Sequence, residues 1–251
     1  MHTWIASGLF IYGLILGSFF NVVGLRVPNK ELFKEQRSYC PSCKESLQWY
    51  ELIPVISFVI QSGRCRHCRG NISKLYPVME LFSGIMFSSC YLVYGWSFDL
   101  LLALLLISLF HIIIVSDLTY MVIPDKVLLF FFILLLSYRA LFPLTPFWAP
   151  LIGGFAGIAG TALIILASRG GMGGGDMKLL GLIGFALGLK LLVVTFFLAT
   201  LIGTLTSGSL LWSGKVSRKQ PIPFGPFIVL GAIIALFSGH LLIEWYLTSF
   251  F

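Results

Sequence analysis

Charged side chains are scarce in this sequence of 251 residues. Lysine and arginine contribute 17 residues and aspartate and glutamate 10, so only 11% of the chain is charged, whereas 58% is apolar. Soluble globular domains carry roughly 25% charged residues. This shortage excludes an ordinary soluble domain and predicts an all-α polytopic integral membrane protein.

The sequence also lacks the marks of a cleavable signal peptide. Its first residues, Met1-His-Thr-Trp4, contain no lysine or arginine, and the first apolar run is followed by Asn21 and Arg26 instead of a small-residue cleavage site. We therefore expect the first run to remain as a transmembrane helix. No dinucleotide-binding G-x-G-x-x-G fingerprint between a strand and a helix is present either.

Apolar runs dominate what is present. They fall at 4–25, 78–95, 99–115, 127–142, 148–167, 178–189, 190–212 and 224–248. The run at 178–189 is short for a span of about 20 residues, so it can also be read as fused to the next run. The positions of lysine and arginine decide between eight separate spans and a fused helix, because these residues favour the cytoplasmic side. With eight spans and both termini outside, only Arg139 and Lys190 of the 17 basic residues lie outside. Fusion would also place Lys215, Arg218 and Lys219 outside, so we predict about eight transmembrane helices.

This topology explains the net charge of +7 without nucleic acid as a partner. It leaves one soluble segment of any size, the loop at residues 28–76, on the cytoplasmic side. A loop of fewer than 50 residues buries little apolar surface, so it needs disulfides or a bound metal ion to stabilise its fold.

Two C-x-x-C pairs in the loop can provide this stabilisation. Cys40-Pro-Ser-Cys43 and Cys65-Arg-His-Cys68 are separated by 21 residues, a spacing typical of a structural zinc site with four thiolate ligands. Two disulfides and free thiols are the alternatives, but a cytoplasmic location disfavours disulfides. His67 is a less favoured ligand. The remaining cysteine, Cys90, lies in an apolar run and is read as a core residue.

A glycine-rich stretch, Ser168-Arg-Gly-Gly-Met-Gly-Gly-Gly-Asp-Met-Lys178, separates two apolar runs and carries one acid, Asp176. Glycine permits sharp turns and the close approach of another chain. The stretch is either a solvated interhelical loop or a place where a peptide can reach the acid.

The predicted topology places Asp117, at the inside end of the third run, at the same face and depth as Asp176. Two carboxylates held close in a low-dielectric site share a proton, so one can activate water while the other protonates the scissile amide. This arrangement is typical of aspartic protease chemistry. A proton relay in a transporter and a zinc-containing scaffold without chemistry are the alternatives.

Structural roles are expected for most other polar residues near the apolar runs. Asp125 is expected to cap the helix that follows it, and Lys178 to anchor the inside end of the sixth span. Glu80 is expected either to pair with a basic residue or to bind a ligand. His111 is read as a satisfied core residue. Gly17 suits close helix packing, and Asn21 can bond across helices.

Taken together, the motifs resemble those of the type IV prepilin leader peptidases, bacterial membrane aspartyl proteases whose active-site motif is similar to that of presenilin-like Gly-x-Gly-Asp enzymes. The resemblance runs nearly end to end. Its segments are Gly17-Ser-Phe-Phe-Asn-Val22 with Arg26 and Pro28, the two C-x-x-C pairs, Leu52-Ile-Pro54, Tyr76-Pro-Val-Met-Glu80, Asp117, Ile123-Pro-Asp125, Gly173-Gly-Gly-Asp-Met-Lys178 and Pro223-Phe-Gly-Pro226. The sequence departs from the family where Val22-Val-Gly-Leu-Arg26 replaces a run of larger residues that ends in Tyr-Arg.

The resemblance implies a catalytic dyad of Asp117 and Asp176, supported by Gly173, Gly174, Gly175, Lys178 and Asp125. It implies cleavage of the basic leader of prepilins or pseudopilins at the cytoplasmic face of the bacterial inner membrane. It also implies S-adenosylmethionine-dependent methylation of the new N-terminus, with Glu80 as a cofactor-binding candidate, although a peptidase without methyltransferase activity is an alternative. The expected divisions are residues 1–27 as the first span, 28–76 as the zinc loop, 1–95 as the methyltransferase part and 77–251 as a seven-helix protease core.

Overall fold

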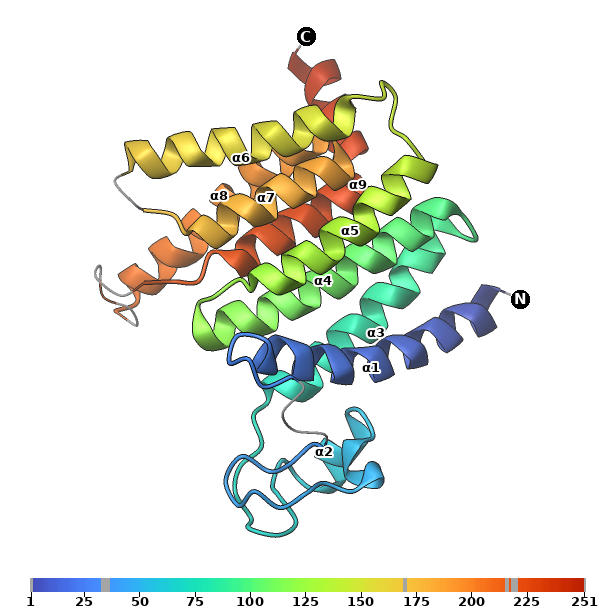
Figure 1. Ribbon diagram of the computed structural model, residues 1–251, viewed down its shortest axis with the longest axis vertical. Coiled ribbons are helices and arrows are strands. Elements are labelled where there is room, and N and C mark those ends of the chain that lie inside the picture. The colour runs from blue at the N-terminus through green and yellow to red at the C-terminus, as the bar shows by residue number, and fades with distance from the viewer. Residues whose placement is uncertain (1, 33–36, 169–170, 215–216, 218–220, 251) are drawn as a thin grey trace. The chain divides into compact units, whose positions relative to one another are not determined.

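A computed structural model describes residues 2–32, 37–168, 171–214, 217 and 221–250. Five residues counted in the charge argument, Lys34, Arg169, Lys215, Arg218 and Lys219, lie outside the described residues. The described chain is helical and contains isolated β-bridges but no strand. It folds as two compact units, residues 1–119 and 120–251 (Figure 1). The domain boundaries expected from the sequence stay predictions.

Every apolar run of the sequence forms a helix. The long helices are α1 (His2–Arg26), α3 (Leu75–Tyr94), α4 (Phe98–Tyr120), α5 (Asp125–Leu141), α6 (Ala149–Ala167), α7 (Gly174–Leu187), α8 (Leu189–Trp212) and α9 (Gly225–Phe250). Two short elements, η1 (Trp49–Leu52) and α2 (Ile56–Ile60), lie in the cysteine loop. An all-helical membrane protein is therefore confirmed.

Among the described helices, six are long and apolar enough to cross a membrane: α1, α3, α4, α6, α8 and α9. The other two long helices are shorter, with 17 residues in α5 and 14 in α7. At 1.5 Å per residue, α7 extends about 21 Å, which is less than a hydrocarbon core of about 30 Å. The predicted count of eight spans is thus not confirmed. The fused alternative is wrong, because Gly188, with a φ of +81°, separates α7 from α8.

In the first unit, α1 and α3 pack against each other in opposite directions. The Asn21 side-chain amide donates to the Tyr76 carbonyl over 3.2 Å, and His2 Nδ1 lies 3.1 Å from the Tyr91 hydroxyl. Close packing depends on glycine, since a Cβ at Gly13 would lie 2.6 Å from the Ser83 carbonyl oxygen. Gly17 also faces Ser83, which confirms its predicted packing role.

A buried polar cluster ties α4 to α1 and α3. His111 is fully buried, with Nδ1 2.5 Å from the Ser83 hydroxyl and Nε2 3.1 Å from the Asn21 side-chain oxygen. Because both ring nitrogens have partners inside an apolar helix bundle, the desolvation of the imidazole is offset. The reading of His111 as a satisfied core residue is confirmed, and Asn21 does bond across helices.

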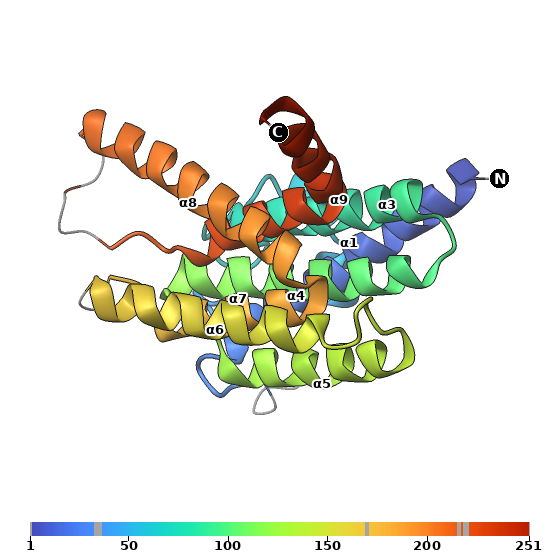
Figure 2. The ribbon, with the colours of Figure 1, turned by 90° about the horizontal axis from the view of Figure 1, so that it is seen from above.

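In the second unit, α6 lies along α7, and α8 pairs with α9 (Figures 1 and 2). The contact between α6 and α7 is made by glycines, because a Cβ on Gly153 would overlap the Gly184 carbonyl group. A Cβ on Gly157 would lie 2.6 Å from the Leu180 carbonyl oxygen. The short α7 is thereby held against its neighbour by direct backbone packing.

Helices α5 and α7 run in the same direction. At their C-terminal ends, the buried Arg139 of α5 donates from Nε to the Ala186 carbonyl of α7 over 3.0 Å. At their N-terminal ends, Lys178 of α7 contacts Asp125 of α5. Both helices therefore begin on the same side of this unit, as the predicted topology requires.

Candidate active site and cysteine cluster

The glycine-rich stretch ends in the first turn of α7. Gly173 is the N-cap residue, Gly174 begins the helix, and Asp176 is the third helical residue. The Gly173 backbone N–H donates to Asp176 Oδ2 over 3.2 Å, and Asp176 is only 8% exposed. A carboxylate at this position also meets the positive end of the helix dipole. Asp176 is therefore a buried acid held by its own helix N-terminus.

The three glycines before Asp176 differ in their surroundings. A Cβ at Gly175 would lie 2.9 Å from Ile123 Cβ, and a Cβ at Gly173 would lie 3.1 Å from Asp176 Oδ2. A Cβ at Gly174 would meet no atom within 4 Å among the described residues. Packing thus explains the missing side chain at Gly175, whereas Gly174 faces open space.

An ion pair fastens this turn to the start of α5. Lys178 Nζ lies 2.7 Å and 2.8 Å from the two carboxylate oxygens of Asp125. The predicted capping role of Asp125 is wrong, because Pro124 is the N-cap residue and no side chain caps the helix. Asp125 is the first helical residue, so its carboxylate is free to bind the lysine on the neighbouring helix.

Asp117 lies three residues before the end of α4 and is 5% exposed. It belongs to the first unit, whereas Asp176 belongs to the second. The two acids occupy opposite kinds of helix terminus, the last turn of α4 for Asp117 and the first turn of α7 for Asp176. The helix dipole therefore acts with opposite sign on the two carboxyl groups.

The structure brings the four predicted cysteine ligands together. The Sγ atoms of Cys40, Cys43, Cys65 and Cys68 all lie within 4.8 Å of one another, and none of these cysteines forms a disulfide. Cys40 and Cys68 Sγ are 3.8 Å apart. Tetrahedral zinc with bonds of about 2.3 Å places its sulfur ligands roughly 3.8 Å apart. Such a cluster can hold a metal ion.

The two cysteine pairs have the same backbone geometry. Lys44 N–H donates to the Cys40 carbonyl, and Arg69 N–H donates to the Cys65 carbonyl. Lys44 and Arg69 each follow the second cysteine of their pair and have positive φ angles of 61° and 59°. In the first turn, backbone N–H groups also point toward the Cys40 sulfur atom. Hydrogen bonds from the Cys43 and Ser42 backbone accordingly lower the pKa of the Cys40 thiol to about 6, despite some desolvation.

His67 lies outside the sulfur cluster. Its side chain is 46% exposed, and Nε2 lies 4.0 Å from Oε2 of Glu51. The Glu51 side chain is buried in the loop and accepts the Gln48 backbone N–H over 2.9 Å. The preference for four cysteine ligands over His67 agrees with this arrangement. Cys90 is fully buried in α3, as expected of a core residue.

Glu80 connects the cysteine loop to the membrane helices. Its Oε2 accepts the Val55 backbone N–H over 2.8 Å, its carboxyl group is hydrogen-bonded to the Ser18 side chain, and the residue is only 7% exposed. Among the described residues, its partners are thus a backbone amide and a hydroxyl, and the predicted pairing with a basic residue is wrong. Its role toward a cofactor stays a prediction.

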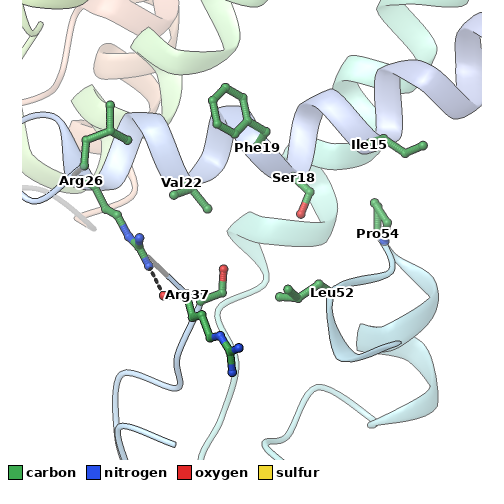
Figure 3. Close-up of a pocket in the computed structure, with 10 residues that line it drawn as sticks. Ile15, Ser18, Phe19, Val22, Arg26, Arg37, Leu52 and Pro54 are labelled. Atoms are coloured by element: carbon green, nitrogen blue, oxygen red, sulfur yellow. Dashed lines mark hydrogen bonds between the residues drawn. The ribbon is translucent and has the colours of Figure 1, made fainter. Parts of the chain in front are cut away.

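A cavity of about 680 Å³ opens beside these contacts, between α1 and the loop (Figure 3). One stripe of α1 forms its first wall, with Ile15 and Phe19 in the middle of the helix and Arg26 at its end. Arg37, Ser38, Leu52 and Pro54 are among its loop residues. Arg26 donates to the Arg37 carbonyl over 3.1 Å. Sequence reasoning missed Arg37 and Ser38 as residues that line this cavity, because they belong to no recognisable motif.

Comparisons with known proteins agree with the motif resemblance. Residues 11–94 match the bacterial peptidase A24 N-terminal domain, and residues 104–208 match the type IV leader peptidase family. No similar solved structure was found.

Curated relatives cover nearly the whole chain. A prepilin leader peptidase/N-methyltransferase of Bacillus subtilis is 41% identical over 96% of this chain and 97% of its own length. Proteins with the same name from Vibrio cholerae and Aeromonas hydrophila are 33% and 31% identical, over 92% and 97% of the chain and 96% and 94% of their own lengths. With these matches added to the buried acid and the cysteine cluster, the chain belongs to the type IV leader peptidase family.

Proposed function

We propose that this protein is a prepilin leader peptidase whose catalytic acids are Asp117 and Asp176. The observation that carries the proposal is the first turn of α7, where a buried Asp176 follows the open backbone of Gly174. Asp117 supports it because only six positions separate this residue from Ile123, which packs on Gly175.

The helix termini suggest how the acids divide the chemistry. The N-terminus of α7 and the Gly173 N–H favour the ionised form of Asp176, so Asp176 is the better base. Asp117 is then the acid that holds the proton shared by the pair. Asp176 takes a proton from water as the water oxygen attacks the scissile carbonyl carbon. Asp117 donates its proton toward the carbonyl oxygen, and proton transfer to the leaving amine then completes cleavage.

The substrate class is a prepilin or pseudopilin, whose apolar helix would lie among the membrane helices while its basic leader reaches the acids. Gly174 leaves room beside Asp176 for an extended peptide backbone. The basic residues around the cysteine loop support a cytoplasmic location for this end of the protein, because the positive-inside rule favours lysine and arginine on that side. We accordingly assign the protein to the bacterial inner membrane, with the active site and the loop facing the cytoplasm.

We also propose one structural zinc ion in the cysteine loop. Four cysteine sulfur atoms within 4.8 Å of one another fit a zinc ion, and four thiolate ligands would leave no open coordination position for catalysis. The ion would hold together a segment that has little apolar core of its own. Its ligands are Cys40, Cys43, Cys65 and Cys68.

The names of the relatives further suggest N-methylation of the new N-terminus, with S-adenosylmethionine as the methyl donor. The cavity between α1 and the loop fits this cofactor, since Arg26 and Arg37 can bind a carboxylate and Phe19 and Leu52 can contact an adenine ring. Bound S-adenosylmethionine supplies an electrophilic methyl group. Glu80 does not line the cavity, but it holds Ser18 and Val55 in place beside it.

The deciding experiment is cleavage of a purified prepilin by the protein in proteoliposomes. Asp117→Asn and Asp176→Asn should each abolish cleavage while preserving folding and zinc content. Asp99→Asn, which changes an exposed acid near the start of α4, is the matched control and should cleave normally. Full activity in either dyad variant would refute the catalytic assignment.

A further inference from the structure

The segment Trp49–Ile60 of the cysteine loop, here named the arm, exposes an unusual amount of apolar surface. Trp49 is 76% exposed, and Ile56, Val59 and Ile60 are 56%, 68% and 67% exposed. Glu51 is the single charged residue of the arm, and its side chain is buried. Several large apolar side chains exposed on one short segment favour a contact with protein or lipid.

The arm reaches helix positions that lie within the membrane spans. Val55 is bonded to Glu80, five residues into α3 from Leu75, or about 8 Å along the helix axis. The same carboxyl group binds Ser18, eight residues before the charged end of α1 at Arg26, or about 12 Å along that axis. Pro54 and Leu52 accordingly lie opposite Ile15 and Ser18 in Figure 3, away from Arg26.

Several backbone N–H groups of the arm have hydrogen-bond acceptors within the protein, which a nonpolar environment requires. Glu51, Ile56, Ser57 and Val59 donate their N–H groups to carbonyls within or next to the arm. At the turn, Val55 adopts a φ of 61°, a strained value for a β-branched residue, and the buried Glu80 carboxylate accepts its N–H. Backbone that enters a bilayer requires this internal pairing, because lipid chains accept no hydrogen bonds.

Exposed apolar side chains of α1 lie beside the arm. Ile15 and Phe19, 55% and 57% exposed, belong to a membrane-spanning helix and line the same cavity as Leu52 and Pro54. At the base of the arm, Arg66 stacks over the Tyr50 ring at 5.3 Å from the ring centre. An aromatic pair with a neighbouring arginine is typical of a membrane–water interface.

We propose that the arm inserts into the lipid bilayer beside α1 and α3 and is pinned there by Glu80. Trp49 and Tyr50 lie at headgroup level, and Ile56, Val59 and Ile60 contact acyl chains. The sequence predicted a soluble loop. Insertion of the arm instead attaches the loop to the membrane, so the cysteine cluster and the cavity lie at the bilayer surface. Glu80 is a positioning residue that acts through Val55.

The test measures the fluorescence of Trp49 in lipid nanodiscs, taken as the difference between wild-type protein and Trp49→Phe. Lipids brominated on their acyl chains should quench this signal strongly, and aqueous iodide should quench it weakly. The control is Glu45→Trp in the Trp49→Phe background, which puts the indole on an exposed cysteine turn and should show the reverse pattern. Zinc content verifies that the loop is folded in each variant.

Two results would overturn the proposal. Quenching of Trp49 by iodide but not by brominated lipid would place the arm in water. Protection from both quenchers would show that protein, such as a second copy of this chain, covers it. The pinning role has its own pair of variants: Glu80→Gln retains an acceptor for the Val55 N–H and should preserve lipid quenching. Glu80→Leu removes the acceptor and should shift Trp49 toward iodide, and equal behaviour of the two variants would refute the role of Glu80.

Discussion

Lys178 of α7 and Asp125 of α5 form a two-pronged ion pair, with the lysine nitrogen 2.7 Å and 2.8 Å from the carboxylate oxygens. The residues are 53 positions apart in the chain, yet they join the first turns of two parallel helices. Lys178 follows Asp176 by two positions, so the pair holds the turn that carries the proposed catalytic acid.

We expect Lys178→Met to slow prepilin cleavage while leaving stability almost unchanged. The pair is partly exposed, with side-chain exposures of 49% and 70%, and such pairs contribute only about 0–1 kcal/mol. The effect on cleavage arises because the N-terminus of α7 loses its ion pair with the first turn of α5. Cleavage rate and thermal unfolding, measured on the same preparation, separate these effects. The charge-swapped double variant Asp125→Lys/Lys178→Asp should recover part of the lost activity, and no recovery would contradict a role for the pair.

Gly174 and Gly175 should respond differently to the same substitution. Gly174→Ala should fold normally, and even gain up to about 1 kcal/mol, because alanine favours helix and its Cβ meets open space. It should nevertheless slow cleavage, because the methyl group occupies the space proposed for the substrate backbone. Gly175→Ala should cost about 1–3 kcal/mol, since its Cβ would lie 2.9 Å from Ile123 Cβ. Thermal unfolding and steady-state cleavage test both expectations. Normal cleavage by Gly174→Ala would rule out a close approach of the substrate there.

The backbone contact between α6 and α7 predicts another paired result. Gly153→Ala should lower the midpoint of thermal unfolding, because its Cβ would overlap the Gly184 carbonyl group. Relieving such an overlap requires the helices to separate, at a cost of about 1–3 kcal/mol. Gly160→Ala is the matched control on the same helix, where a Cβ meets nothing within 4 Å among the described residues. Equal midpoints for the two variants would mean that the close contact does not stabilise the protein.

Metal analysis should find one zinc ion per chain. Cys40→Ser should remove it, since a serine hydroxyl is a poor substitute for a thiolate ligand. The cysteine loop should then become sensitive to proteolysis, while the membrane helices keep their helical content by circular dichroism. Cys90→Ser is the control, because Cys90 is buried in α3, away from the cluster, and should leave the zinc content unchanged. A metal-free wild-type protein with an intact, protease-resistant loop would contradict the proposal.

Much of the architecture could be read from the sequence because it depends on local patterns. Apolar runs predicted all eight long helices, since a chain in lipid must pair its backbone groups within each segment. The C-x-x-C spacing predicted the cluster of four sulfur atoms, because each pair of ligands comes from a single turn. The number of spans was less predictable, since α5 and α7 are too short to be judged by length alone.

The partners of individual polar residues could not be predicted in the same way. Asp125 has the sequence context of a helix cap, yet it binds Lys178. Glu80 was expected either to pair with a basic residue or to bind a ligand, and it accepts the Val55 N–H. The roles of Gly174 and Gly175 were likewise indistinguishable until Ile123 was seen to pack on Gly175 but not on Gly174. Each of these outcomes depends on which segment packs against the residue, and the local sequence does not specify that segment.

The sequence by itself determined the membrane class, the helices, the family motifs and the four cysteines that cluster, because hydrophobicity and short-range spacing are properties of neighbouring residues. Only the tertiary structure decided that Glu80 accepts the Val55 N–H of the arm, that Lys178 pairs with Asp125 of α5, and which glycines serve packing. Those features arise when residues tens of positions apart are brought within 3 Å, and their energies depend on burial and direction, which no local pattern records.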